Sequence, residues 1–96
     1  MEFRISDAAF DFFESMQPEN KSIRIRGKVY GSTNIHDGFS VALETGVPNN
    51  PIMTAEKGDV LVYAEKGDEW FFAGYDLEID YNEDEEMTTY FFVEED

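Results

Sequence analysis

The sequence predicts an α+β fold in which one N-terminal helix packs on short, mostly antiparallel or mixed β-strands, arranged as two small sheets or a flattened barrel. Apolar residues recur at helical spacing between Ala9 and Met16. Two later runs, 22–30 and 39–44, alternate apolar and polar residues with the period of two that a half-buried strand shows. The 96 residues include nine Phe, five Tyr and one Trp, and each buried aromatic ring removes about 150–250 Å² from water. The chain therefore has enough apolar surface for the core of one domain over residues 1–96.

The first 20 residues predict a short strand followed by a helix. Residues 2–5 are typical of an edge strand, and Ser6 is a good N-cap because its hydroxyl can accept a hydrogen bond from the first helical turn. The helix should run for about ten residues with one side toward the core, and it should end before Pro18. Its apolar positions are Ala9, Phe10, Phe12, Phe13 and Met16. We interpret the three Phe side chains as core residues and not as a ligand-binding box.

A strand pair between Ser22 and Leu43 is the central feature of the predicted fold. In its first strand, Ile23, Ile25, Gly27 and Val29 alternate with Arg24, Arg26, Lys28 and Tyr30. In its second strand, Phe39, Val41 and Leu43 share one face. The connecting segment 31–38 is too long for a two-residue turn and rich in turn-forming residues, so we expect a polar loop where a site would lie. We also expect the three basic residues of the first strand to pair across one sheet with Asp76, Glu78 and Asp80.

The rest of the chain predicts further strands and one helical turn. We expect strands at 52–56, 60–63, 76–81 and 88–93, with turns at 57–59 and 82–86 and a loop at 45–51. Residues 65–74 favour a short helical turn that brings Trp70 and Phe71 inward and ends at Gly74.

Composition and charge exclude several classes of function. Residues 29–96 contain two basic and 17 acidic residues and carry the whole net charge of −15. Such a chain repels nucleic acids and anionic membranes, so the charge fits a basic protein partner or serves solubility alone. The absence of Cys excludes disulfides, thiolate nucleophiles and zinc–thiolate sites. No apolar run approaches the roughly 20 residues of a membrane helix and no signal-peptide pattern is present, so we expect a cytoplasmic protein.

Three segments could carry chemistry, and each also has a simpler explanation. The acidic run 80–86 does not fit the EF-hand pattern and is interpreted as a solvated turn. His36 is the single histidine and, with Asp37, a candidate metal ligand or base. No second histidine or nucleophile motif accompanies it, which favours an exposed loop histidine without catalytic duty. The segment 31–34 lacks the spacing of a phosphate-binding loop. We therefore expect no catalytic residue and no bound cofactor.

Four stretches together suggest a family. They are ISDAA at 5–9, the strand 23–31 that leads into Gly-Ser-Thr, GFSVAL at 38–43 and GYDLEIDYNED at 74–84. Their order resembles the HesB/IscA-like family of A-type iron–sulphur cluster carriers, and in particular its small cysteine-less members of Gram-positive type. The resemblance implies a single HesB-like domain over 1–96 and a role related to iron–sulphur cluster biosynthesis. Ser32 stands about where the carriers have their first cysteine, and residues 90–96 lack their Cys-Gly-Cys motif, so the resemblance implies no self-sufficient cluster site.

We therefore expect a non-enzymatic protein that acts by binding another protein, as a monomer or a homodimer. The candidate contact residues lie on or beside the 31–38 loop and are Tyr30, Ser32, Asn34 and His36. The alternative is a weak iron-binding protein that uses carboxylates and His36, with Asp37 as a second candidate ligand. In neither case is a nucleic acid or a membrane expected as a partner.

Overall fold

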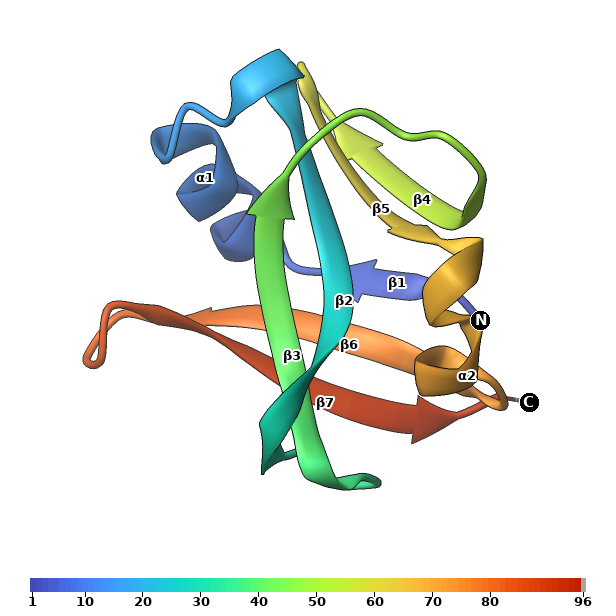
Figure 1. Ribbon diagram of the computed structural model, residues 1–96. Helices are drawn as coiled ribbons and strands as arrows, with labels where there is room; N and C mark the ends of the chain where they lie inside the picture. The colour runs from blue at the N-terminus through green and yellow to red at the C-terminus, as the bar shows by residue number, and fades with distance from the viewer. Residues whose placement is uncertain (96) are drawn as a thin grey trace.

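Two β-sheets form the body of the molecule (Figure 1). The computed structural model describes residues 1–95, and Asp96, the end of the predicted domain, lies outside the described residues. The three-stranded sheet has the order β1 (Phe3–Ile5), β6 (Tyr75–Asn82), β7 (Met87–Glu94). The four-stranded sheet has the order β3 (Asp37–Thr45), β2 (Ser22–Ser32), β5 (Val60–Glu65), β4 (Pro51–Lys57). Each sheet is mixed, because β1 pairs with β6 and β2 pairs with β5 in parallel, whereas the other neighbours are antiparallel.

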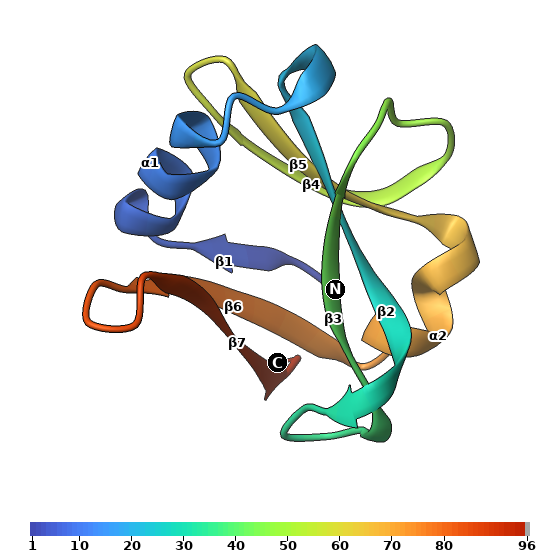
Figure 2. The ribbon, with the colours of Figure 1, turned by 60° about the vertical axis from the view of Figure 1, so that its left-hand side comes forward.

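The core lies between the two sheets, whose strands cross one another in Figure 1. Alternation assigns the inner positions, since successive side chains of a strand point to opposite faces. Ile23 and Ile25 of β2 and Leu77 and Ile79 of β6 are almost wholly buried, whereas Glu78 between the last two is exposed. Helix α1 (Asp7–Ser15) and helix α2 (Glu69–Phe72) lie on opposite sides of the molecule (Figure 2).

The N-terminal elements follow the prediction except at Met16, which lies after the helix and is 46% exposed. Ser6 caps α1, since its Oγ accepts a hydrogen bond of 3.1 Å from the Ala9 N–H. The helix ends at Ser15, and Gln17 then adopts φ 49°, outside the helical range. Ala9, Phe10 and Phe13 form the buried stripe of α1 and pack in the core.

The expected α+β, HesB-like fold class is wrong, because strands make up more than half of the described chain. The two α-helices have only nine and four residues. One short helix covers only one part of the core, so the inner faces of two mixed sheets supply most of the buried surface. The strands also run further than the alternation predicts: β2 continues to Ser32 and β3 starts at Asp37, which leaves a connection of only four residues, 33–36.

Two further expectations are corrected. The basic row of β2 does not pair with the acidic row of β6, because the two strands belong to different sheets. Arg24 instead binds Glu44 and Asp68, while Asp76 binds Arg4. In the predicted helical turn, Phe71 and Phe72 point inward and are fully buried, whereas Trp70 is 51% exposed. A four-residue helix directs only part of its surface inward, and here Phe72 takes the place predicted for Trp70.

Candidate functional site

The tip of the β2–β3 hairpin carries the residues that the sequence singled out. Tyr30 and Gly31 interrupt the pairing of the two strands and have φ of 77° and 93°. This irregularity is a β-bulge, which bends a strand and re-aims its side chains. The Tyr30 ring is 82% exposed, and its carbonyl oxygen accepts a hydrogen bond of 3.0 Å from Ser40 Oγ. Ser32, also exposed, closes the hairpin opposite Asp37.

The connection between the strands is ordered by its own polar side chains. Thr33 Oγ1 accepts hydrogen bonds from the N–H groups of Ile35 and His36, at 3.2 and 2.9 Å. Asn34 reaches across to strand β7: its Nδ2 donates to the Phe92 carbonyl and its Oδ1 accepts from the Phe92 N–H, both at 2.8 Å. The Asn34 amide therefore pairs with both backbone groups of Phe92 on the edge strand β7, as a neighbouring strand would.

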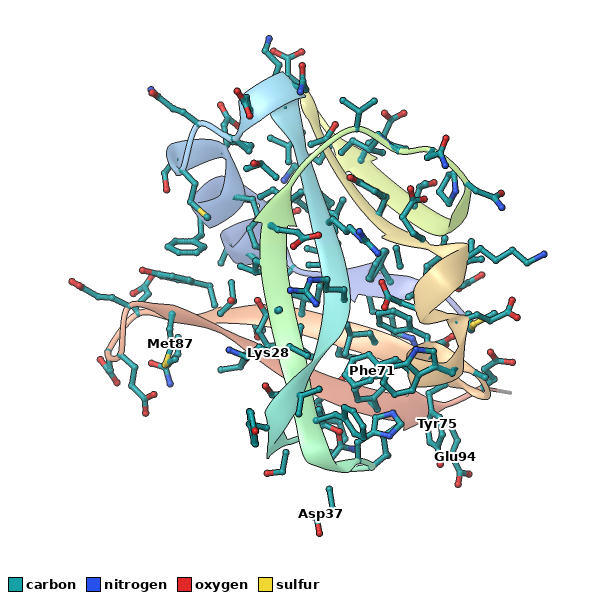
Figure 3. All side chains as sticks on the ribbon, in the orientation of Figure 1. Lys28, Asp37, Phe71, Tyr75, Met87 and Glu94 are labelled. Carbon is teal, nitrogen blue, oxygen red and sulfur yellow. The ribbon has the colours of Figure 1, made fainter. Side chains whose placement is uncertain are left out.

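His36 turns inward and is half-buried, so the expectation of an exposed histidine is wrong. Its ring stacks on Phe71 with centroids 4.7 Å apart and an interplanar angle of 13°. Its Nε2 lies 2.8 Å from the Phe71 carbonyl oxygen. A carbonyl only accepts, so Nε2 carries a proton and offers no lone pair to a metal or a substrate. Asp37 points away from the body of the molecule at the hairpin tip (Figure 3), so the two candidate ligands diverge.

An aromatic cluster connects the hairpin to α2. The ring of Trp70 meets the rings of Phe39, Phe71 and His36 edge-on, with centroid distances of 5.1, 5.4 and 6.1 Å. Phe39 lies opposite Val29 in the strand register, so the two side chains share one face. Trp70, Phe39 and Val29, with Tyr30 at their edge, form what we call the hairpin patch. Three of its four side chains are more than half exposed, and Trp and Tyr are the residues that most often anchor protein–protein contacts.

The outer side of the three-stranded sheet is the second surface of interest. Asp76, Glu78 and Asp80 form a row on β6, beside Thr89, Phe91 and Val93 on β7. We call these six residues the β6–β7 face. The Phe91 ring is 55% exposed directly opposite Glu78 in the register. Met87 and Glu94 mark the two ends of β7 in Figure 3. Both helices contact β6, and the buried residues of α1 and α2 belong to the core on the inner side of this sheet.

Hydrogen bonds organise the carboxylates of this face. Arg4 Nη2 donates to Asp76 Oδ2 at 2.7 Å, and the Glu2 N–H donates to Asp76 Oδ1 at 3.0 Å. These contacts, with the bond from Arg4 the stronger cause, lower the pKa of Asp76. The Ser6 hydroxyl donates to Asp80 Oδ1 at 2.7 Å and lowers the pKa of Asp80, helped by the Tyr81 N–H. All four donors stabilise the charged form of a carboxylate, so both groups remain anionic at neutral pH.

The geometry supports contact surfaces more than a reaction centre. Within residues 1–95, no group of three or more His, Asp or Glu side chains is placed to hold a metal ion. None of the helices in the same range is long and apolar enough to cross a membrane. Of the predicted contact residues, Tyr30 and Ser32 face solvent, whereas Asn34 and His36 bind Phe92 and Phe71 of the protein itself.

Sequence reasoning found Tyr30 but missed one exposed aromatic residue on each surface, Trp70 and Phe91. Trp70 was assigned to the core and Phe91 received no role. Alternation gave a usable signal for Phe91: its neighbours Tyr90 and Phe92 share one face of the strand, so Phe91 lies on the opposite face. Nothing local identifies Trp70 as exposed, because its position depends on the packing of Phe71 against β2.

No family model matches the sequence. The chain is similar to the pyruvate dehydrogenase inhibitor of Bacillus subtilis (strain 168), with 28% identity over 86 residues, which cover 88% of this chain and 90% of the relative. The relative is named as an inhibitor and not as an enzyme, in agreement with the predicted non-enzymatic class. A protein inhibitor of an enzyme acts on another protein, which supports a protein partner.

The same comparison corrects the family resemblance. The HesB/IscA-like identification, and with it the role in iron–sulphur cluster biosynthesis, is contradicted by the name of the relative. The alternative of an iron-handling protein that uses carboxylates and His36 is contradicted as well. Three of the four stretches that suggested the family are strand and turn segments: 23–31 lies in β2, 38–43 lies in β3, and 74–84 covers β6 and the following turn. Alternating patterns of this kind recur in unrelated β-proteins, so they carry little family information.

Proposed function

We propose that this chain is a non-enzymatic protein that binds a pyruvate dehydrogenase complex and inhibits it. The observation that carries the proposal is the similarity to the Bacillus subtilis inhibitor, which extends over nearly the full length of both chains. Similarity of that extent favours a shared fold and a shared mode of action over a match limited to one motif. The proposal places the chain in the bacterial cytoplasm, together with the complex.

The hairpin patch is the first candidate contact surface. Tyr30 and Trp70 offer large rings with little side-chain entropy to lose, and both remain exposed in the folded chain. Thr33, Asn34 and His36 fix the connection that supports them, through hydrogen bonds to the loop itself, to β7 and to α2. A contact surface held in this way loses less conformational entropy on binding than a flexible loop. We assign Tyr30 and Ser32 to direct contact, and Asn34 and His36 to support.

The net charge of −15 favours a basic surface on the partner. The same charge opposes self-association, so we propose that the chain binds as a monomer. Attraction between opposite charges raises the association rate, and salt screens this attraction. The association rate should therefore fall as the salt concentration rises.

The test is inhibition of the purified Bacillus subtilis pyruvate dehydrogenase complex, followed as NADH formation. Saturable inhibition that weakens between low and high salt is expected. Tyr30→Asn removes the ring but keeps a residue that tolerates the positive φ at this position, and it should weaken inhibition at least about tenfold if Tyr30 is an anchor. Val47→Ser is the matched control, because Val47 is 64% exposed on the β3–β4 loop, outside the hairpin patch.

Two outcomes would contradict parts of this proposal. Unchanged NADH formation at saturating concentrations of the folded chain would refute inhibition itself. Inhibition that Tyr30→Asn and Val47→Ser leave equally intact would keep the inhibitor function and remove the hairpin patch from it.

A further inference from the structure

The geometry of the β6–β7 face points to a docking surface for an arginine-bearing segment of the partner protein. The guanidinium group would lie over the Phe91 ring and form ion pairs with Glu78 and Asp80. This inference rests on the proposed function, because it makes the β6–β7 face a second surface through which the inhibitor contacts the same partner.

Phe91 presents an exposed aromatic side chain on the outer face of β7. The residue is 55% exposed, and its neighbour on β6 is Glu78. Residues directly opposite each other in an antiparallel pair have Cβ atoms about 4.5–5.5 Å apart. The next pair along the strands is Asp80 with Thr89, so a second carboxylate lies diagonally to the Phe91 ring. An aromatic face beside carboxylates binds a guanidinium group better than an ammonium group, because only the guanidinium is planar enough to stack and to pair in two directions.

Arg4 shows that this face already accommodates one guanidinium group. It lies on β1, on the other side of β6, opposite Glu78 in the register. Its Nη2 binds Asp76 at 2.7 Å, and its Nη1 approaches Glu78 Oε2 at 3.9 Å. On the β7 side the cation must come from elsewhere, since residues 75–95 contain nine acidic and no basic residues.

Charge decides among the possible occupants of the face. A second copy of this chain would bring the same acidic row, and the acidic turn 83–86, against its equivalent. Like charges placed directly opposite each other destabilise an interface. Nucleic acids and anionic lipid surfaces are repelled for the same reason. A basic protein segment with an arginine at its centre complements both the charge and the exposed ring.

The first test uses a synthetic peptide and does not depend on any enzyme. The acetylated, amidated peptide Arg-Leu-Arg-Leu-Arg is titrated into the ¹⁵N-labelled chain, and amide shifts are followed by NMR. Saturable shifts confined to β6 and β7 are expected, with affinity about threefold higher than for the lysine analogue. Phe91→Thr, which keeps a residue suited to a strand, should remove this preference for arginine. Shifts spread over all acidic segments, or equal affinities for the two peptides, would overturn the inference.

The second test uses the pyruvate dehydrogenase complex and a charge-matched pair of variants. Glu78→Lys and Glu56→Lys change the net charge equally, but Glu56 lies on β4 in the other sheet. Glu78→Lys should weaken binding to the complex at least about tenfold. Glu56→Lys should weaken it less than about twofold, because it changes only the net charge, whose long-range effect is screened by salt. Equal losses would refute the docking surface while leaving inhibition intact. Absence of binding by the parent chain would refute the proposed function. The peptide titration would still show whether the β6–β7 face binds arginine.

Discussion

The imidazole ring of His36 lies flat against the Phe71 ring, and its Nε2 donates to the carbonyl oxygen of the same residue at 2.8 Å. One side chain of the hairpin thus satisfies a backbone acceptor of α2 and covers one of its two fully buried rings. His36→Ala removes both contacts, and we expect it to lower the free energy of unfolding by about 2–3 kcal/mol, the sum of a lost ring contact and an unsatisfied acceptor. Urea denaturation measures the change.

His36→Phe separates the two contributions. It keeps an aromatic ring for stacking and leaves only the Phe71 carbonyl without its donor, so about half of the loss should return. Equal destabilisation by His36→Ala and His36→Phe would show that the hydrogen bond alone fixes α2. No destabilisation by either variant would contradict the support role assigned to His36.

Gly27 of β2 packs directly against the Phe71 ring of α2. A Cβ atom at this position would lie 2.7 Å from Phe71 Cδ1 and 2.8 Å from Phe71 Cγ. Gly27→Ala should therefore destabilise the fold by about 1–3 kcal/mol through overpacking, measured by thermal or urea unfolding. Gly67→Ala is the matched control, because a Cβ there meets nothing within 4 Å. Combining Gly27→Ala with Phe71→Leu should recover part of the loss, and additive losses would contradict the proposed clash.

Local patterns identified most secondary-structure elements because each depends on short-range physics. Ser6 caps α1 where its hydroxyl predicts, and the alternation in 76–81 lies within β6. The class of the fold could not be obtained in the same way. β2 pairs with β5 about 40 residues later in the chain, and β1 pairs with β6 74 residues later. No local sequence pattern indicates which distant strands will pair. The predicted ion pairs between β2 and β6 failed for this reason, since opposite charges on two alternating strands do not show that the strands are neighbours.

The candidate site was predictable only in its position. Turn-forming residues correctly placed a connection after Gly31, and it lies at the exposed end of a hairpin. The roles of Asn34 and His36 depend on Phe92 and Phe71, which are 58 and 35 residues away. A polar side chain on a loop is equally compatible with binding a partner and with capping a distant backbone group. Only the fold distinguishes these cases.

Asp76 predicts the pH dependence of stability. The hydrogen bond from Arg4 lowers its pKa in the folded chain below the unfolded value of about 3.9. Its contribution is therefore complete above the unfolded pKa and is lost as the pH falls through the lower, folded pKa. Asp76→Asn should destabilise the fold by about 1–2 kcal/mol at pH 7, because a charge-assisted hydrogen bond is removed. The difference between parent and variant should shrink below about pH 4; a difference independent of pH would show that the cost comes from packing and not from charge.

Arg24 connects three elements that support the hairpin patch. Its Nη1 binds Glu44 of β3 at 3.2 Å, and its Nη2 binds Asp68, just before α2, at 2.8 Å. Arg24→Lys keeps the charge but provides one ammonium group for two carboxylates on different elements, so we expect a loss of about 1 kcal/mol. Arg26→Lys is the control, since Arg26 binds Glu44 and does not contact Asp68. Trp70, the single tryptophan, follows Asp68 by two residues, and its fluorescence emission should shift to longer wavelength in Arg24→Lys only. The same shift in both variants would mean that the position of α2 depends on Glu44 rather than on the bond between Arg24 and Asp68.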